Sequence, residues 1–338
     1  METRLKAFFV AALLFSLVAC EPEEELRSGL FVSDQIGQMD MVSADGIDYQ
    51  YEAYFDLSSN SMKAKNRRDA WDLAFSADPQ NPNIYVNSAQ FMRVAATRSL
   101  NFDSAYTASD FDFEFERVYR FYQRGWMSDA LQDPKGQVFL IDRGQDLQGR
   151  KRGYYKLQIQ AFSNGSYQLR FANLDGANSQ VLNVETQADY NYQFLSLASP
   201  DSLLSLEPPK DEWDLHVCKY MERLWDGSDT LDYSVTGILI NSKSALAYRD
   251  TLLSADSTLN FGDIQAGDIQ HHQLKPKTEA IGHEWKYYDL DEGTYLVRNR
   301  WIYFIEDAEG TIYRLRFIGF YGAEGQKGNV SFEYLPLE

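Results

Sequence analysis

Apolar and polar side chains alternate with a period of two through much of this chain, and the alternation predicts β-strands. In Tyr313–Phe317 tyrosine, leucine and phenylalanine fall on one side and two arginines on the other. This period suits a sheet with one buried and one solvated face. We expect three strands, Trp301–Glu306, Thr311–Tyr321 and Val330–Tyr334, with the first two joined across the turn Asp307–Gly310.

The same strand pattern occurs earlier in the chain, which indicates an internal repeat. Tyr155–Phe162 alternates like the later strand, and Trp71–Phe75 matches Trp213–Val217. Each Trp-Asp-Leu run is followed by an apolar strand that ends in Asn-Ser, at Asn87 and at Asn241. The landmarks keep the same order and a similar spacing, which favours tandem duplication. Convergent strand composition is the alternative interpretation.

The chain shows no alternation of strands and helices of the kind that builds a parallel α/β fold. Ser244–Ser254 is the best helix candidate, because its leucines lie partly on one face. We therefore predict a mainly β protein made of two tandem antiparallel β-sheet units with few short helices. The expected segments are a signal peptide at 1–19, an acidic tether at 20–47, a first unit at 48–189 and a second unit at 190–338.

The N-terminus predicts export from the cell. Basic residues precede the apolar run Ala7–Ala19, which is too short to span a bilayer. Leu17–Cys20 resembles the lipobox of bacterial lipoproteins, whose cysteine becomes acylated, so Cys20 is the expected lipidation site. An ordinary secretory signal with an incidental cysteine is the alternative. The acidic run Glu21–Glu25 looks like the signal that Bacteroidota lipoproteins use for surface display, or serves only as a solvated tether.

The net charge and the cysteine content exclude several classes of partner and of site. A formal net charge of −18 repels nucleic acid and anionic lipid. An apolar content of 44%, rich in Tyr and Phe, is sufficient for a substantial β-type core. Beyond Cys20 only Cys218 remains, which excludes an intrachain disulfide and a cysteine-based metal cluster. We expect Cys218 to be a small buried residue.

Enzyme signatures are absent from the sequence. Gly144–Lys151 imitates the spacing of a phosphate-binding loop, but it lacks the required Lys-Ser/Thr pair and reads as a charged hairpin loop. No Gly-x-Ser-x-Gly elbow, His-Glu-x-x-His pair or dinucleotide fingerprint occurs. Carboxylates are too numerous for one pair to be chosen as general acid and base. We therefore predict that the protein is not an enzyme and assign no catalytic residue.

The four histidines all lie in the second half of the chain. His216 falls within a strand, on the side opposite its apolar neighbours, and is interpreted as an ordinary strand residue. His271 and His272 precede a loop, and His283 stands before the aromatic run Trp285–Tyr288. Haem iron is bound by neutral imidazole nitrogens beside an apolar wall, which these loop histidines could supply. Exposed surface residues are the alternative interpretation for each of them.

The order of motifs resembles the HmuY-like lipoproteins of Bacteroidota. The resemblance covers most of the chain from Tyr49 onward, as two family units in tandem, and is strongest in the final part. The motifs that carry it are Trp71–Phe75, the Asn-Ser pairs at Asn87 and Asn241, Tyr295–Phe304, Gly310–Phe317 and Ser331–Tyr334.

The resemblance implies an all-β surface or secreted protein that binds haem and feeds an outer-membrane haem receptor. In the best-known members two His or two Met from loops ligate the iron, one of them just before the strand that matches Tyr295–Phe304. Here the corresponding loop, Lys286–Gly293, holds no His or Met, which is a departure from the family pattern.

The function expected on this basis is binding of haem or a related porphyrin through His271 or His272 together with His283, for iron acquisition. No metal site beyond the haem iron is expected. The protein would be lipid-anchored in the outer membrane and face the cell exterior. The alternative is a non-catalytic surface lipoprotein that binds a protein partner without haem.

Overall fold

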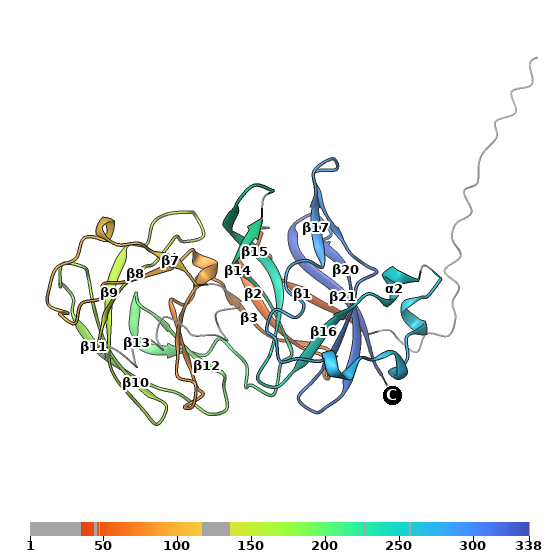
Figure 1. The fold of residues 1–338 in the computed structure, drawn as a ribbon, viewed down its shortest axis with the longest axis horizontal. Coiled ribbons are helices and arrows are strands. Elements are labelled where there is room, and N and C mark those ends of the chain that lie inside the picture. The colour runs from red at the N-terminus through yellow and green to blue at the C-terminus, as the bar shows by residue number, and fades with distance from the viewer. Residues whose placement is uncertain are drawn as a thin grey trace, which may run out of the picture. The chain divides into compact units, whose positions relative to one another are not determined.

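The chain folds mainly into antiparallel β-strands, as the sequence predicts (Figure 1). A computed structural model describes residues 35–43, 46, 48–116, 136–225, 227–256 and 258–337. The predicted signal peptide, the predicted lipidation site Cys20 and most of the predicted acidic tether lie outside these residues.

Two sheets are built largely from the first half of the chain. One has six strands in the order β11-β10-β9-β8-β6-β7, and the other has four in the order β13-β12-β4-β5. Their bounds are β4 (Leu73–Ser76), β5 (Ile84–Val86), β6 (Arg93–Ala96), β7 (Glu114–Phe115), β8 (Val138–Asp142), β9 (Tyr154–Ser163), β10 (Ser166–Ala172), β11 (Gln180–Glu185), β12 (Tyr192–Ser196) and β13 (Ser199–Leu204).

Two further sheets combine strands from both ends of the chain. Their orders are β1-β21-β20-β19-β16 and β15-β14-β2-β3, and β17 and β18 form a separate two-stranded ribbon. The bounds are β1 (Gln35–Asp40), β2 (Tyr51–Asp56), β3 (Ser61–Arg67), β14 (Leu215–Trp225), β15 (Thr230–Ile240), β16 (Leu246–Asp250), β17 (Lys286–Asp289), β18 (Thr294–Val297), β19 (Ile302–Glu306), β20 (Ile312–Tyr321) and β21 (Lys327–Pro336).

Helices are short, in line with the prediction. The described helices are η1 (Ser88–Gln90), η2 (Ala108–Asp110), α2 (Leu252–Ala255), η4 (Phe261–Asp263), η5 (Ala266–Asp268) and η6 (His271–Gln273). None of them has the length and apolar character needed to span a bilayer.

The helix predicted at Ser244–Ser254 is wrong over most of its length. Leu246–Asp250 is strand β16, which pairs with β19, and only Leu252–Ala255 is helical. Tyr248 lies opposite Phe304 in this pairing, and their rings stack with centroids 5.2 Å apart. Pairing with the sheet edge thus overrides a weak helical periodicity.

The three predicted C-terminal strands are confirmed as β19, β20 and β21. The turn between the first two is closed by a hydrogen bond from the Gly310 N–H to the Asp307 carbonyl at 3.1 Å. Asp307 Oδ1 also accepts from the Thr311 N–H at 2.8 Å. Gly310 has a φ of +82°, a conformation that glycine adopts without a steric penalty.

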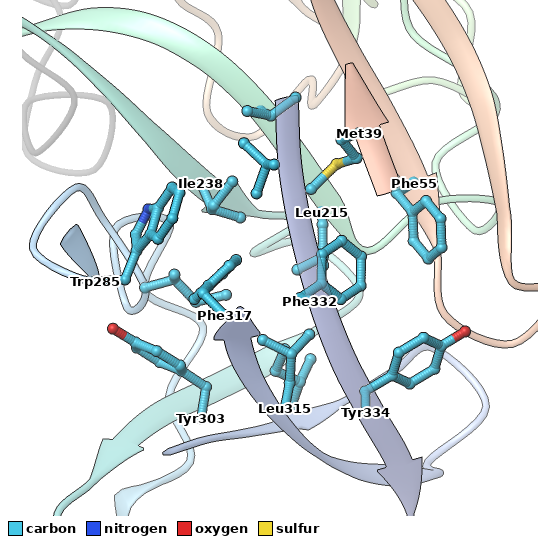
Figure 2. Close-up of a cluster of buried hydrophobic side chains, with 14 of the residues drawn as sticks. Met39, Phe55, Leu215, Ile238, Trp285, Tyr303, Leu315, Phe317, Phe332 and Tyr334 are labelled. Carbon is cyan, nitrogen blue, oxygen red and sulfur yellow. The ribbon is translucent and has the colours of Figure 1, made fainter. Parts of the chain in front are cut away.

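The largest core cluster joins the C-terminal strands to strands from the start of the chain. Figure 2 shows Met39 and Phe55 in the same cluster as Phe317, Phe332 and Trp285. The rings of Phe55 and Phe332 meet edge to face with centroids 5.1 Å apart, and Trp285 stacks on Phe317 at 4.4 Å. Burial of these large apolar side chains fixes how the early strands pack on the late ones.

In the sheet β1-β21-β20-β19-β16, the face that carries Arg314 is not fully solvated. The alternation of apolar and polar residues predicts a solvated face there. Arg314 is buried, its guanidinium lies over the Phe261 ring, and it donates to the carbonyl of Ile264. The segment that contains these two residues forms a second apolar cluster against Ile302 and Phe304. This segment therefore forms a second layer over the face of the sheet that carries the arginines.

Strand pairing crosses the boundary predicted between residues 189 and 190 in both directions. Strand β2 comes from the first predicted unit, yet it pairs with β14 of the second. Strand β12 comes from the second unit, yet it pairs with β4 of the first. The strand pairing does not test whether the chain arose by duplication, so the division into two tandem units stays a prediction.

Candidate functional site

A cavity of about 420 Å³ is lined by tyrosines, lysines and one histidine. We call it the tyrosine–lysine cavity. The residues that matter here are Tyr49, Lys219, Tyr233, His283, Lys286, Tyr287, Tyr288, Tyr295 and Lys327. Its volume falls in the range of about 300–1,000 Å³ that is usual for small-molecule sites.

Lys286 supplies a buried positive charge to this cavity. Its side chain is among the buried polar groups, and its ammonium donates to the Thr236 carbonyl at 2.5 Å. The ammonium also lies 4.5 Å from the centroid of the Trp285 ring and 4.7 Å from that of Phe320. Burial, and then the positive charge of Lys219, lower the pKa of Lys286 to about 7.

Lys219 adds a second ammonium to the same wall. It lies 4.9 Å from the centroid of the Tyr49 ring. Burial, and then the charge of Arg68, lower its pKa to about 8. Asp48 also lines the cavity, but within the described part of the chain neither lysine forms an ion pair with a carboxylate. In a chain of net charge −18, such a pair of uncompensated cations favours an anionic ligand.

Tyrosine rings provide the flat apolar surface of the cavity. Tyr295 meets Tyr288 and Phe320 edge to face, each with centroids 5.2 Å apart. Tyr288 is exposed, so its ring stays available to a ligand, whereas the guanidinium of Arg298 lies over the Tyr287 ring. Burial raises the pKa of Tyr49 above its ordinary value, so this side chain offers a ring and an O–H group rather than a phenolate.

His283 is the predicted site residue that lines this cavity. Burial, and then the charge of Lys286, lower the pKa of its imidazole. The neutral imidazole is therefore favoured, which is the form that ligates a metal.

His271 and His272 lie in the short helix η6 and are exposed. Neither lines the tyrosine–lysine cavity, so the structure does not bring them together with His283 there. Among the described residues no group of three His, Cys, Asp or Glu side chains is placed to hold a metal ion.

Sequence reasoning missed Lys219 and Lys286. Lys219 lies at every second position after Leu215 and Val217 in β14, and a single lysine in such a strand carries no signal of a binding site in the sequence. The signal that could have marked Lys286 is its position inside the aromatic run Trp285–Tyr288, where a lone lysine is surrounded by large rings.

A smaller cavity of about 110 Å³ is lined by strands β2, β4, β12 and β14 and the segments beside them. We call it the tryptophan cavity. Six aromatic side chains line it, Tyr220 among them, together with polar groups that include Glu52, Glu207 and His216. The other aromatic residues are Tyr54, Trp71, Tyr192, Phe194 and Trp213. Cys218 also lies in its wall and is buried, as predicted.

Comparison with known proteins identifies the family. The sequence model of the HmuY protein family matches residues 48–334, which is most of the chain. A comparison with curated proteins gave no match.

Three solved structures are similar over most of their length at low identity. Apo PinO from Porphyromonas gingivitis is 10% identical, with 90% of this chain and 97% of that chain covered and a TM-score of 0.28. A Bacteroides vulgatus protein described as HmuY-like and heme-binding is 11% identical, with 90% and 94% covered and a TM-score of 0.23. The apo HmuY analog of Tannerella forsythia is 8% identical, with 90% and 96% covered and a TM-score of 0.24.

Proposed function

Because the chain belongs to the HmuY family, we propose that it binds haem or a related porphyrin for uptake. The binding site is the tyrosine–lysine cavity. The protein acts as a binding protein rather than an enzyme, and it passes its ligand to an outer-membrane haem receptor.

The observation that carries this proposal is the pairing of tyrosine rings with uncompensated lysines in one cavity. A porphyrin is a flat apolar ring system with carboxylates on one edge. Tyr288 and Tyr295 supply ring surface for the macrocycle. Lys219 and Lys286 supply the positive charge that the carboxylates require. Ion pairing with the ligand would relieve the cost of keeping two buried ammonium groups without a counterion.

For haem itself, His283 is the proposed iron ligand in this cavity. Its imidazole is favoured in the neutral form, and it shares the cavity wall with both lysines. The predicted contribution of His271 and His272 stays a separate prediction, since both residues lie on η6.

Titration of the purified mature protein with haemin and with metal-free protoporphyrin tests the proposal. We expect both compounds to bind, with a shifted Soret band for haemin. His283→Ala should remove most of the Soret shift and leave protoporphyrin binding nearly intact. The double variant Lys219→Met, Lys286→Met should weaken both ligands. An unshifted Soret band and no protoporphyrin binding would contradict the proposal.

A double variant, His271→Ala with His272→Ala, separates the two histidine hypotheses. If haemin binds through His283 in the cavity, this variant keeps the wild-type spectrum. Loss of the Soret shift in this variant would instead assign a ligand role to η6.

A second candidate function is binding of a protein partner without haem. Large apolar side chains are exposed at the ends of two hairpins: Trp225 is 66% exposed on β14, and Leu290, after β17, is 87% exposed. Exposed apolar groups of this size are typical of interaction sites. Failure of both ligands in the titration, with these side chains still required for capture of a receptor, would favour this alternative.

We also propose that the protein is anchored in the outer membrane through acylated Cys20, facing the cell exterior. The support is the lipobox-like Leu17–Cys20 and the acidic run after it. Cys20→Ala should release the protein from the membrane fraction, and surface proteolysis of intact cells should degrade the wild-type protein. A variant that remains in the membrane fraction would contradict the anchor.

A further inference from the structure

The tryptophan cavity contains several buried polar atoms that lack a hydrogen-bond partner. Within the described chain these atoms include Glu52 Oε1, Asn87 Oδ1 and Trp71 Nε1. Glu52 and Asn87 are at most 3% exposed. Each such atom costs about 1–3 kcal/mol when it stays unpaired, so a set of them around one cavity indicates an occupant.

The wall is aromatic on several sides. Tyr54 meets Trp213 edge to face with centroids 4.9 Å apart and stacks on the His216 imidazole at 4.1 Å. Trp71 and Phe194 meet edge to face at 5.2 Å. A planar aromatic guest prefers edge-to-face or offset-stacked contacts with rings of this kind. The volume of about 110 Å³ is somewhat below that of an engineered apolar cavity, about 150 Å³, that holds benzene.

The charges of the wall favour a neutral guest. The Glu52 carboxylate lies 3.4 Å from His216 Nε2, so these two groups offset each other. Glu207 is held by donors of the protein itself: Asn191 at 2.8 Å, the Trp213 indole at 3.2 Å and the Tyr192 N–H at 2.9 Å. Lys243 also lines the cavity and forms an ion pair with Asp78 at 3.4 Å. Each of these charged groups therefore already has a partner within the protein.

The ammonium of Lys219 adds no charge to the wall of the tryptophan cavity. It lies over the Tyr49 ring, which lines the tyrosine–lysine cavity and not the tryptophan cavity. Lys219 thus contributes its stem to this wall, while its charge belongs to the neighbouring site.

The hydrogen-bonding atoms define what the guest must carry. Glu52 Oε1 and Asn87 Oδ1 are acceptors, so they require an N–H or O–H donor on the guest. Trp71 Nε1 is a donor only and requires an acceptor. We propose that the tryptophan cavity is a second binding site, specific for a small neutral planar heteroaromatic molecule that carries both an N–H donor and an acceptor nitrogen. This site is independent of the porphyrin proposal.

Three five-membered rings of nearly equal size test the proposal. Pyrazole carries a donor and an acceptor, pyrrole a donor, and furan an acceptor. Binding is followed by isothermal titration and by the ¹⁵N-indole NMR signals of Trp71 and Trp213. We expect pyrazole to bind more tightly than either pyrrole or furan. Each matched hydrogen bond should add roughly fivefold to tenfold in affinity.

Trp71→Phe removes the unpartnered donor and keeps an aromatic ring. We expect this variant to bind pyrazole only about as tightly as pyrrole, while the affinity for pyrrole is unchanged. Trp225→Phe is the matched control, since Trp225 is exposed at the end of β14 and does not line the cavity. If Trp71→Phe fails to fold, Ala89→Leu, which fills the cavity, should abolish pyrazole binding instead.

Two results would overturn the proposal. Equal binding of all three rings would show an apolar cavity without hydrogen-bond selection. No binding of pyrazole at millimolar concentration would show that the cavity holds water only. Haemin titration of the Trp71→Phe variant distinguishes the two sites, because its Soret shift should match that of the wild type.

Discussion

The carboxylate of Asp214 accepts a hydrogen bond from the backbone N–H of Leu57 at 2.8 Å. Asp72 makes the matching bond, to the N–H of Leu197 at 2.7 Å. Each aspartate follows the tryptophan of a Trp-Asp-Leu run and reaches the end of a strand from the other half of the chain. The two sites differ in their charges, and that difference predicts opposite effects of the same substitution.

Asp214→Asn should stabilise the protein near neutral pH. Burial, and then the negative charges of Asp56, Asp307 and Glu309, raise the pKa of Asp214 from 3.8 to about 7. The folded protein therefore binds this proton more tightly than the unfolded chain does. The stability that the group contributes is complete below pH 3.8 and is lost as the pH rises toward 7.

An asparagine keeps the acceptor for the Leu57 N–H and carries no charge. The gain over the wild type should therefore be close to zero at pH 4 and reach a plateau above pH 7, with an upper limit of about 4 kcal/mol. Chemical denaturation across this pH range measures the effect. A gain of equal size at both ends of the range would contradict the assignment to Asp214.

Asp72→Asn should destabilise the protein. Asp72 is fully buried and forms ion pairs with Arg143 at 3.0 Å and with Arg152 at 2.9 Å. Removal of its charge leaves two largely buried guanidinium groups without their partner, at a cost of about 3–5 kcal/mol. The unfolding midpoint in denaturant gives this value, with Asp214→Asn as the matched control. A neutral result would mean that the arginines find other acceptors.

Much of the β architecture could be predicted from the alternation alone. The hairpin of β19 and β20 follows from apolar residues at every second position and from an acidic turn that ends in Gly310. The layer over Arg314 could not be predicted in this way. Its partner Phe261 lies in a segment without clear periodicity, so the burial of the arginine depends on tertiary contacts that no local pattern encodes.

The candidate site was predictable only in part. His283 was identified because it stands beside a run of aromatic residues, and it does line the tyrosine–lysine cavity. Lys219 was missed because its neighbour across the cavity, Lys286, comes much later in the chain. The shared wall exists only after β14 and β17 have been brought together by folding.

Two buried tyrosines should respond differently to loss of their hydroxyl groups. The Tyr334 hydroxyl donates to the Leu57 carbonyl at 2.8 Å, whereas the Tyr303 hydroxyl has no partner among the described residues. Tyr334→Phe should therefore cost about 1 kcal/mol, and Tyr303→Phe should be neutral or slightly stabilising. Both side chains are fully buried in the same cluster, so each variant serves as the control for the other. Equal destabilisation would indicate a water-mediated partner for Tyr303.

Lys286→Met should stabilise the ligand-free protein and weaken porphyrin binding, and both effects depend on pH. The folded-state pKa of Lys286 is about 7, below its ordinary value of 10.5, because the buried ammonium is disfavoured. The destabilisation that Lys286 causes is absent above pH 10.5, grows as the pH falls, and is complete below pH 7. The gain from methionine should therefore be larger at pH 6 than at pH 9.

In the wild type, porphyrin affinity should increase over the same fall in pH that makes Lys286 destabilise the ligand-free protein. Because the ligand's carboxylates favour the ammonium form of Lys286, binding takes up a proton near neutral pH, and wild-type affinity should rise as the pH falls from 9 to 6. Lys286→Met should lower affinity by about tenfold at pH 6 and remove most of this pH dependence. Fluorescence titration with protoporphyrin measures both. Lys277→Met, at an exposed lysine outside the cavity, is the control and should keep the wild-type profile. A pH profile that survives in Lys286→Met would assign the proton uptake to Lys219, and an unchanged affinity would remove Lys286 from the site.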